Sequence, residues 1–507
     1  MPSGGSSSAL ENKHWQDRLP SFLKRQERAD VIVGDVGEGA RGVVVGKNVV
    51  QIGTLVVPAR LAIVLVALLV GLVAGSAFLA WNLWVPDRMT GLFNIAVAEF
   101  GQVDAQGQVH PTSKGQAISQ RLFDGLRVEF DSLPVNVRQD LQPQLWHDSL
   151  GITRKRVRIG IVPGETPEAR AEAARQLARR INAHVIIYGN LPADGSGAGF
   201  VPEVYVSPGA GIDVEADKIV GVYQPIGAIP VQLLDKANDP IVGRSITIRL
   251  NSMTNVLSLF TIGLMYDLLG YPGRALPVLQ QAEDELASTG QDGNEVLWFF
   301  IGREALWLKR DEEAQPAFEE AVRLNPNYAR ARLGLGDIHL NKAYGQSSAD
   351  RIQAPDLEQA IAEYQKALET AEPSVKVEAL YSLGAVYRLK GETLLNLADF
   401  PAADSAFVTT VGYLSAALDA LKNTERYRLL AQTYLTLGEA YEDQGHVQLR
   451  QNNKEGSRPF FEEARTSYDR CIQQEDAAPT DLILTDQIVG KLCVPYKKLV
   501  EEELASP

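Results

Sequence analysis

The longest apolar run of the chain lies close to its N-terminal end. Residues 61–85 contain no ionisable side chain, and only Ser76 and Asn82 within them are polar. A helix of this length spans roughly 37 Å, whereas a hydrocarbon core is roughly 30 Å thick. A cleaved signal peptide has a shorter apolar region, of about 7 to 15 residues, much closer to the first residue. The pattern therefore predicts a single transmembrane helix within residues 58–86.

The basic residues on either side of this run predict its orientation. Eight Lys or Arg residues precede it, whereas Arg88 is the only one among residues 86–110. Positively charged flanks tend to stay in the cytoplasm. We therefore expect a single-pass protein of the cell membrane, with residues 1–57 as a cytoplasmic tail and the C-terminal domains outside the cytoplasm.

Residues 92–245 change from this pattern to alternating strand-like and helix-like segments. Short β-branched runs occupy residues 93–100, 157–162 and 184–188, and helical apolar spacing occupies residues 115–133 and 166–182. This order predicts a small α/β domain with a mainly parallel sheet covered by helices. The segments FNIAVAEF, GQAISQRLFDGL and RRINAHVIIYGNL resemble the N-terminal α/β module of TolB and its relatives, which implies the same fold here.

The C-terminal half, residues 252–507, repeats a pattern of large and small residues. The clearest copy carries Trp298, Ile301, Gly302, Ala314, Phe318, Ala321 and Pro326. These residues at this spacing resemble the tetratricopeptide repeat, a two-helix unit of about 34 residues. Small residues let the two helices of a unit approach, and large ones fill the seam between units. We expect about five irregular units, some with insertions such as residues 342–355, forming a helical repeat solenoid that ends in a C-terminal capping helix.

The resemblance to tetratricopeptide repeats implies a protein or peptide partner on the concave face. The first-helix positions beside the packing residues are Phe260, Phe299, Arg303, Arg330, Asp337, Tyr381, Arg388 and Glu439. We predict that these side chains contact the partner. The alternative for each one is a packing or solvated role. Some family members clamp a C-terminal carboxylate with Lys and Asn, but Phe299 and Arg303 stand at two of those positions, so we do not expect that ligand.

Composition excludes some classes of function. A net charge of −14 argues against a nucleic-acid partner, because a basic face must meet the phosphates. Six scattered histidines and two cysteines give no zinc framework, and no serine has the surroundings of a nucleophile elbow. We therefore expect no cofactor, no metal site and no enzymatic activity.

Two local features leave alternatives open. Asp213, Glu215 and Asp217 would lie on one face of a strand, where they suit a hard cation, although a solvated strand edge is favoured. Cys471 and Cys493 are interpreted as two small apolar residues packed in C-terminal helices, and a single disulfide between them is the alternative.

The tail carries a β-prone segment. Its core consists of Asn48, Val50, Gln51, Ile52 and Gly53, which resembles the RIP homotypic interaction motif and related amyloid signalling motifs. Low charge, high β-propensity and the absence of Pro between residues 42 and 57 permit cross-β stacking. Homotypic assembly through this motif is one prediction, and a local β-hairpin or β-arch is the alternative.

Together these patterns predict a fold of α/β plus all-α class with a single transmembrane helix. The leading interpretation is a membrane scaffold or receptor that contacts the lipid bilayer and binds a protein through its repeats. A second is a signalling adaptor that forms a homo-oligomer through its tail. A third is a small-ligand sensor or hydrolase on the α/β domain, which requires a pocket with converging ionisable groups.

Overall fold

A computed structural model describes most of the chain after residue 87. The described residues are 43–45, 49–52, 55–58, 68, 71, 88–133, 138, 142–147, 159–193, 199–210, 214–230, 243–291, 293–353, 355–422, 424–478 and 485–505. The chain divides into two compact units, Met1–Val85 and Pro86–Pro507.

The described part of the first unit is a small antiparallel sheet. Strand β1 (Val43–Val45) pairs with β2 (Val49–Ile52), and β2 pairs with β3 (Leu55–Pro58). Gln51 lies opposite Val44 on one side and Val56 on the other. The strand that contains Val50, Gln51 and Ile52 therefore has both edges paired within the chain, as the alternative of a local hairpin requires. Residues 48 and 53 of the predicted homotypic motif lie outside the described residues, and its assembly stays a prediction.

The predicted transmembrane helix needs correction. Among the residues that the structure describes, no helix combines the length and the apolarity needed to cross a bilayer. The predicted segment, residues 58–86, lies outside the described residues except for Pro58, Leu68 and Gly71. The prediction depended on the apolar character of residues 61–85. The fold class is a mostly helical repeat solenoid with a small α/β region, and the single transmembrane helix is not supported.

The α/β region of the second unit contains a mixed sheet. Its strand order is β12-β11-β8-β4-β7. The strands are β4 (Phe93–Val97), β7 (Pro143–His147), β8 (Val185–Tyr188), β11 (Glu203–Val206) and β12 (Gly221–Tyr223). Strand β4 is parallel to β7 and β8, whereas β11 is antiparallel to β8 and β12. The predicted runs at 93–100 and 184–188 thus form central strands. The described part of 157–162 adds only a bridge between Glu99 and Ile161.

Two smaller sheets flank this one. Strand β5 (Gly101–Val103) lies between β6 (Val109–Pro111) and β9 (Asn190–Leu191), and β10 (Gly199–Phe200) pairs with β13 (Ile229–Pro230). A 3₁₀ helix, η2 (Val214–Ile219), follows β11. The predicted strand over the acidic residues 213–217 is therefore wrong, because residues 214–217 belong to this helix.

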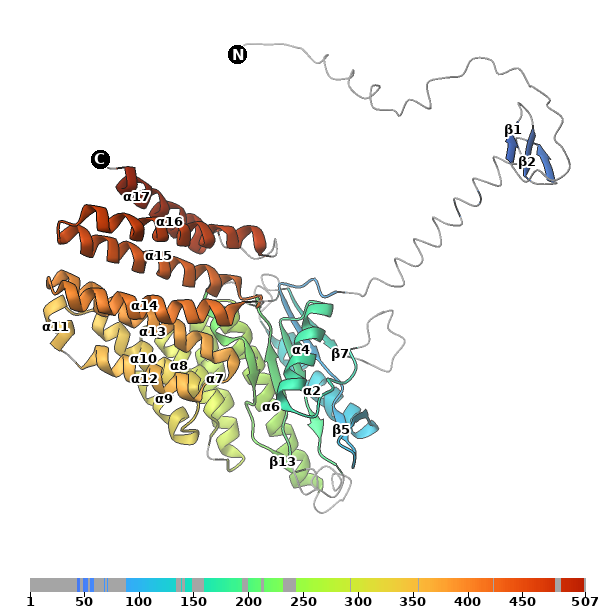
Figure 1. The fold of residues 1–507 in the computed structure, drawn as a ribbon. Helices are drawn as coiled ribbons and strands as arrows, with labels where there is room; N and C mark the ends of the chain where they lie inside the picture. The colour runs from blue at the N-terminus through green and yellow to red at the C-terminus, as the bar shows by residue number, and fades with distance from the viewer. Residues whose placement is uncertain are drawn as a thin grey trace, which may run out of the picture. The chain divides into compact units, whose positions relative to one another are not determined.

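Helices cover both faces of the main sheet (Figure 1). Helix α2 (Ser113–Ser132) packs with Phe93, Ile95 and Val97, and α4 (Pro167–Ile181) packs on the opposite face. Both helices begin with a threonine N-cap whose hydroxyl accepts a hydrogen bond from the backbone N–H three residues later. The predicted helical spacing at 115–133 and 166–182 corresponds to these two helices.

The rest of the unit is a stack of helix pairs (Figure 1). The pairs are α6 (Gly243–Leu268) with α7 (Pro272–Ser288), α8 (Glu295–Trp307) with α9 (Asp311–Leu324), α10 (Ala329–Tyr344) with α12 (Asp356–Thr370), α13 (Pro373–Asn396) with α14 (Phe400–Leu421), and α15 (Tyr427–Arg450) with α16 (Lys454–Ala477). The short helix α11 (Ser348–Gln353) lies in the predicted insertion between α10 and α12.

The C-terminal end is tied to the last pair by a disulfide. A π-helix, η3 (Thr485–Cys493), leads into α17 (Val494–Ala505), and Cys471 in α16 is bonded to Cys493. The favoured interpretation of two unbonded cysteines is therefore wrong, and the alternative of a disulfide is what the structure contains.

Each helix pair depends on a glycine that faces a large side chain. A Cβ atom added to Gly302 would lie 2.8 Å from the Phe318 ring, and one added to Gly336 would lie 2.3 Å from the Tyr364 ring. Real Cβ atoms do not approach a ring so closely, so only glycine allows these helices to pack at this distance. This is the physical reason for the small and large residues that recur in the sequence.

The core is continuous between the sheet and the first repeats. The buried cluster that contains Phe93 and Ile95 also contains Leu257 and Phe260 of α6 and Phe300 of α8. Tyr223 of β12 packs edge-on against Phe300, with ring centroids 5.2 Å apart. The α/β region thus serves as the first layer on which the repeat stack is built.

Candidate partner-binding groove

The first helices of successive repeats line one side of a groove. Its cavity has a volume of about 440 Å³ and is lined by residues of α8, α10, α13 and α15, with contributions from α9, α12 and η2. We call this feature the repeat groove. It is the place where a solenoid of helix pairs presents an extended concave surface.

Aromatic side chains form much of the wall of the repeat groove. Trp307 of α8, Tyr344 of α10 and Tyr381 of α13 line it. Tyr344 is 52% exposed, and Trp307 and Tyr381 are half-buried. Side chains of this kind combine an apolar face with a polar edge, which suits them to contacts with another chain.

Polar side chains lie between these aromatic residues. Arg303 donates two hydrogen bonds to the buried carboxylate of Asp267, at 2.9 and 3.1 Å, and its guanidinium lies 5.4 Å from the Trp307 ring. The Asp337 carboxylate accepts a hydrogen bond of 2.6 Å from the Tyr364 hydroxyl. These contacts fix the two charged side chains in one orientation.

Side chains with amide and hydroxyl groups complete the wall. Asn341 is exposed, Ser382 is half-buried, and both line the repeat groove. Gln432 lines it as well, and its buried Oε1 has no hydrogen-bond partner among the residues that the structure describes. Such groups can donate to and accept from the backbone of a bound peptide.

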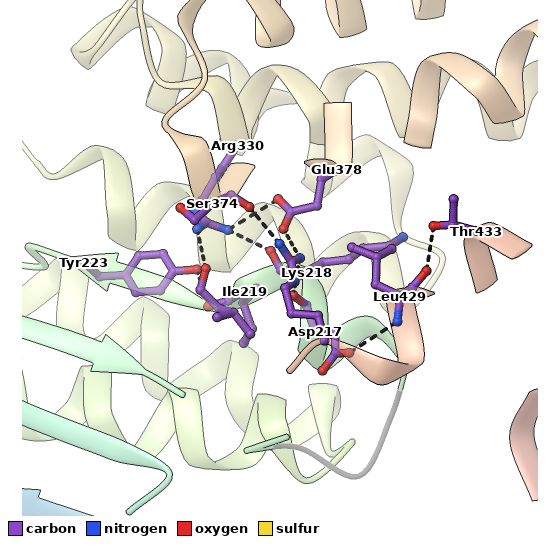
Figure 2. Close-up of polar contacts among 11 residues, drawn as sticks. Asp217, Lys218, Ile219, Tyr223, Arg330, Ser374, Glu378, Leu429 and Thr433 are labelled. Atoms are coloured by element: carbon purple, nitrogen blue, oxygen red, sulfur yellow. Dashed lines mark hydrogen bonds and ion pairs between the residues drawn. The ribbon is translucent and has the colours of Figure 1, made fainter. Parts of the chain in front are cut away.

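A buried cluster of charged side chains (Figure 2) adjoins the repeat groove, and Arg330 and Glu378 of this cluster are among its lining residues. Arg330 donates hydrogen bonds to the backbone carbonyls of Lys218, at 2.7 Å, and Val220, at 2.9 Å. It also lies 3.7 Å from the Glu378 carboxylate and 4.9 Å from the centre of the Tyr223 ring. One arginine of the repeats therefore holds the segment between η2 and β12.

A second arginine strengthens the same junction. Arg426, at the start of α15, donates to Glu378 and to the backbone carbonyl of Asp217. The Asp217 carboxylate accepts a hydrogen bond from the backbone N–H of Leu429 and lies 3.8 Å from Arg428. Burial raises the pKa of Asp217, and the neighbouring guanidinium groups oppose this rise.

The pKa of Glu378 is shifted in the same direction as that of Asp217. Burial raises the pKa of its carboxyl, and Arg426 and Arg330 oppose that rise. The residue is 3% exposed. Because its carboxylate faces two guanidinium groups at once, removing either arginine would leave buried charge with less compensation.

The predicted acidic residue of η2 is therefore part of a structural junction. Asp217 contacts arginines from the repeats, and residue 213 lies outside the described residues. Within the described ranges, no group of three or more His, Cys, Asp or Glu side chains is placed to hold a metal ion.

A further ion cluster lies on α13 and α15. Arg388 contacts Glu439 at 3.2 Å and Asp443 at 3.0 Å. Burial raises the pKa of Asp443 to about 7; Arg388 opposes the rise, and Glu392, Glu439 and Glu442 add to it. Several carboxyl groups thus surround one guanidinium, and one of them takes up a proton near neutral pH.

The eight residues predicted to face a partner occupy three kinds of place. Phe299, Arg303, Arg330, Asp337 and Tyr381 line the repeat groove. Phe260 is fully buried and packs against Phe300, with ring centroids 5.3 Å apart. Arg388 and Glu439 form an ion pair with each other. Five of the eight are thus brought together, and contact with a partner stays a prediction for all of them.

Several groove residues are not among those predicted from the sequence. Trp307 follows Arg303 by one helical turn, and Asn341 and Tyr344 follow Asp337 by one and two turns. Residues at i, i+4 and i+7 share one face of a helix. Extending each first helix by this spacing would have identified them.

Comparisons with known proteins support the repeat fold. Residues 296–328 match the family model described as tetratricopeptide repeat. This segment covers the pair α8 and α9, where the sequence pattern was clearest. The predicted tetratricopeptide repeat is thereby confirmed, and the described helix pairs form a helical repeat solenoid.

Some solved structures show likeness to part of this chain. A thermophilic TPR protein of Thermus thermophilus is 15% identical over 50% of this chain and 100% of its own, with a TM-score of 0.29. PilW, a type IV pilus biogenesis factor, is 15% identical over 49% of this chain and 90% of its own, with a TM-score of 0.27. No curated protein matches this chain. The TolB-like module and the homotypic motif stay predictions.

Proposed function

We propose that this chain is a scaffold that binds a protein partner in the repeat groove. The observation that supports this most directly is a groove of about 440 Å³ lined by half-buried and exposed aromatic side chains from successive first helices. Tetratricopeptide repeats generally bind protein partners on such surfaces. The chemistry of the lining residues indicates which part of a partner would fit.

The partner segment should carry one large apolar side chain. Trp307, Tyr344 and Tyr381 offer apolar faces on three neighbouring helices. Burial of a Leu or Phe side chain between such faces stabilises a complex by about 1.5–3 kcal/mol. Asn341 and Ser382 would hydrogen-bond to the peptide backbone beside this anchor, because their side chains both donate and accept.

Peptide selection tests this proposal without knowledge of the natural partner. A short-peptide display library is selected on the purified full chain, and the affinity of the enriched peptides is measured by calorimetry. Trp307→Ala and Tyr344→Ala should each weaken binding by about tenfold or more, as expected for central aromatic contacts. Tyr271→Ala is the matched control, because Tyr271 is 42% exposed and does not line the repeat groove.

Two results would contradict the proposal. Peptides whose affinity is unchanged in both groove variants would bind elsewhere on the chain. Far-UV circular dichroism of each variant shows whether the helices are retained. A loss of binding in Tyr271→Ala equal to that in the groove variants would also refute the assignment.

We further propose that the repeats work in an oxidising compartment, outside the cytoplasm. The bond between Cys471 and Cys493 supports this, because disulfides persist mainly in such compartments. Alkylation of thiols during extraction from the native cell provides the test. Labelling of both cysteines before any reductant is added would contradict the proposal.

A further inference from the structure

The helix faces that line the repeat groove continue into a group of charged side chains. On α13, Arg388 follows the groove residue Tyr381 by seven positions. On α15, Glu439 follows the groove residue Gln432 by the same number. Residues at this spacing share one face of a helix. A third helix reaches the same group, because Tyr344 of α10 lines the repeat groove and interacts electrostatically with Arg388 and Glu439.

Carboxylates outnumber cations in this group, which we call the acidic end of the groove. It consists of Arg388, Glu392, Glu439, Glu442 and Asp443. Glu439 and Asp443 both contact the guanidinium of Arg388, and Glu442 accepts a hydrogen bond of 2.8 Å from the Tyr468 hydroxyl. One guanidinium thus stands against four carboxyl groups, and the group has room for a further positive charge.

Two acceptors near this end of the groove lack a donor. The carboxylate of Glu392 is half-buried and forms no ion pair or hydrogen bond within the described part of the second unit. The buried Oε1 of Gln432 also lacks a hydrogen-bond partner there. Burial of an acceptor or of a negative charge without a partner is unfavourable. A bound segment with a basic side chain and backbone N–H groups would supply a donor to each.

We propose that the partner segment in the repeat groove carries a Lys or Arg close to its apolar anchor, and that this basic side chain binds the acidic end of the groove. This inference rests on the proposed function. The distance from Tyr381 to Arg388 is about 10 Å along α13, which an extended chain covers in about three residues. The cation would donate charge-assisted hydrogen bonds to Glu392 and Glu439, and its aliphatic stem would lie against the Tyr344 ring.

A basic side chain suits this position better than a free metal ion does. In the ranges that the structure describes, no group of three or more His, Cys, Asp or Glu side chains is placed to hold a metal ion. The guanidinium of Arg388 already lies between Glu439 and Asp443, where it would repel a small dication. A Lys or Arg of a bound segment is held in addition by the contacts of its neighbours in the groove.

Selection of a random peptide library on two forms of the full chain tests the inference. One form is the original chain, and the other is Glu392→Gln/Glu439→Gln. Peptides whose binding depends on Trp307 are kept from each selection, because they occupy the groove. Those selected on the original chain should carry Lys or Arg about two to four positions from the apolar anchor. Those selected on the double variant should show no such preference.

Affinities measured by calorimetry make the test quantitative. Replacing the basic residue of a selected peptide with norleucine should weaken binding to the original chain about fivefold or more. The same replacement should have little effect on binding to the double variant, since coupled contacts give non-additive changes. Glu392→Gln alone retains both ion pairs of Arg388, and it should show part of the loss even if the double variant folds poorly.

A matched control removes the same amount of charge elsewhere. Glu312→Gln/Glu319→Gln changes two exposed carboxylates of α9 that do not line the repeat groove, and it should bind the peptides as the original chain does. Peptides that need Trp307 but not a basic residue would overturn this inference and leave the proposed function intact. Failure to select any peptide that depends on Trp307 would contradict both.

Discussion

Replacing Arg330 with Ala should lower the free energy of unfolding by about 3–5 kcal/mol, the range expected when one partner is removed from a buried ion pair. Arg330 is 4% exposed. Its loss would leave the backbone carbonyls of Lys218 and Val220 without their donors, and Glu378 with one guanidinium in place of two. The junction between the α/β region and the repeats should therefore weaken first.

The individual contacts of Arg330 account for a loss of free energy of unfolding of the same magnitude. A hydrogen bond that involves a charged group contributes about 1.5–3 kcal/mol. Arg330 makes two of these, at 2.7 and 2.9 Å, and adds an ion pair with Glu378 at 3.7 Å. Two such bonds alone account for about 3–6 kcal/mol, so a loss of about 3–5 kcal/mol needs no further contribution.

Urea unfolding measures this effect. With a slope of about 3 kcal/mol per molar urea, a loss of about 3–5 kcal/mol lowers the midpoint by about 1 M or more. Arg323→Ala on the neighbouring helix α9 is the control, because its side chain is 62% exposed and pairs with Glu320 across one turn. That variant should change the free energy of unfolding by less than about 1 kcal/mol.

A conservative substitution at the same position separates charge from geometry. Arg330→Lys retains the charge, but a single ammonium group cannot reproduce the fork that reaches two carbonyls. The urea midpoint of this variant should fall between that of the original chain and that of Arg330→Ala. The reasoning is refuted if Arg330→Ala lowers the midpoint no more than Arg323→Ala does.

Three more outcomes are expected. Gly336→Ala should destabilise the chain by about 1–3 kcal/mol through overpacking against Tyr364, and an unchanged urea midpoint would contradict this. Burial raises the pKa of Asp443 from 3.8 to about 7. Ionisation of this side chain should therefore lower the free energy of unfolding as the pH rises from about 4 to 7, and a further rise in pH should have no additional effect. Asp443→Asn should flatten the dependence of stability on pH in this window, and an unaltered slope would argue against the raised pKa. Reducing the bond between Cys471 and Cys493, which are 22 positions apart, should cost about 3 kcal/mol. Hydrogen exchange of residues 485–505 measures this loss, and equal protection with and without reductant would count against it.

The repeat unit could be predicted from the sequence because its packing leaves a local pattern. Gly302 and Phe318 recur at fixed offsets since the glycine must face the ring. The main helices and central strands of the α/β region were also predictable from their periodicity. Strand β7 was not, because its segment PQLWH is half-buried at the edge of the sheet and shows no alternation.

The roles of the site residues depended on contacts between distant segments. Arg330 was predicted to face a partner, yet its donors reach carbonyls 110 and 112 positions away. Asp217 was assigned to a strand face because the sequence does not reveal the arginines of α15 that surround it. Such pairs become visible only when the tertiary fold brings them together.

The shared core of the sheet and α6 limits how this solenoid could change in length. Duplication can add helix pairs to the interior of a solenoid, because each pair contacts only its neighbours. Here α6 is already committed to α2 on one side and to α7 on the other. A pair inserted ahead of α6 would separate it from the sheet, and a pair inserted between α7 and α15 would separate Arg330 or Arg426 from the carbonyls that they bind. Growth of the stack is therefore restricted to its C-terminal end.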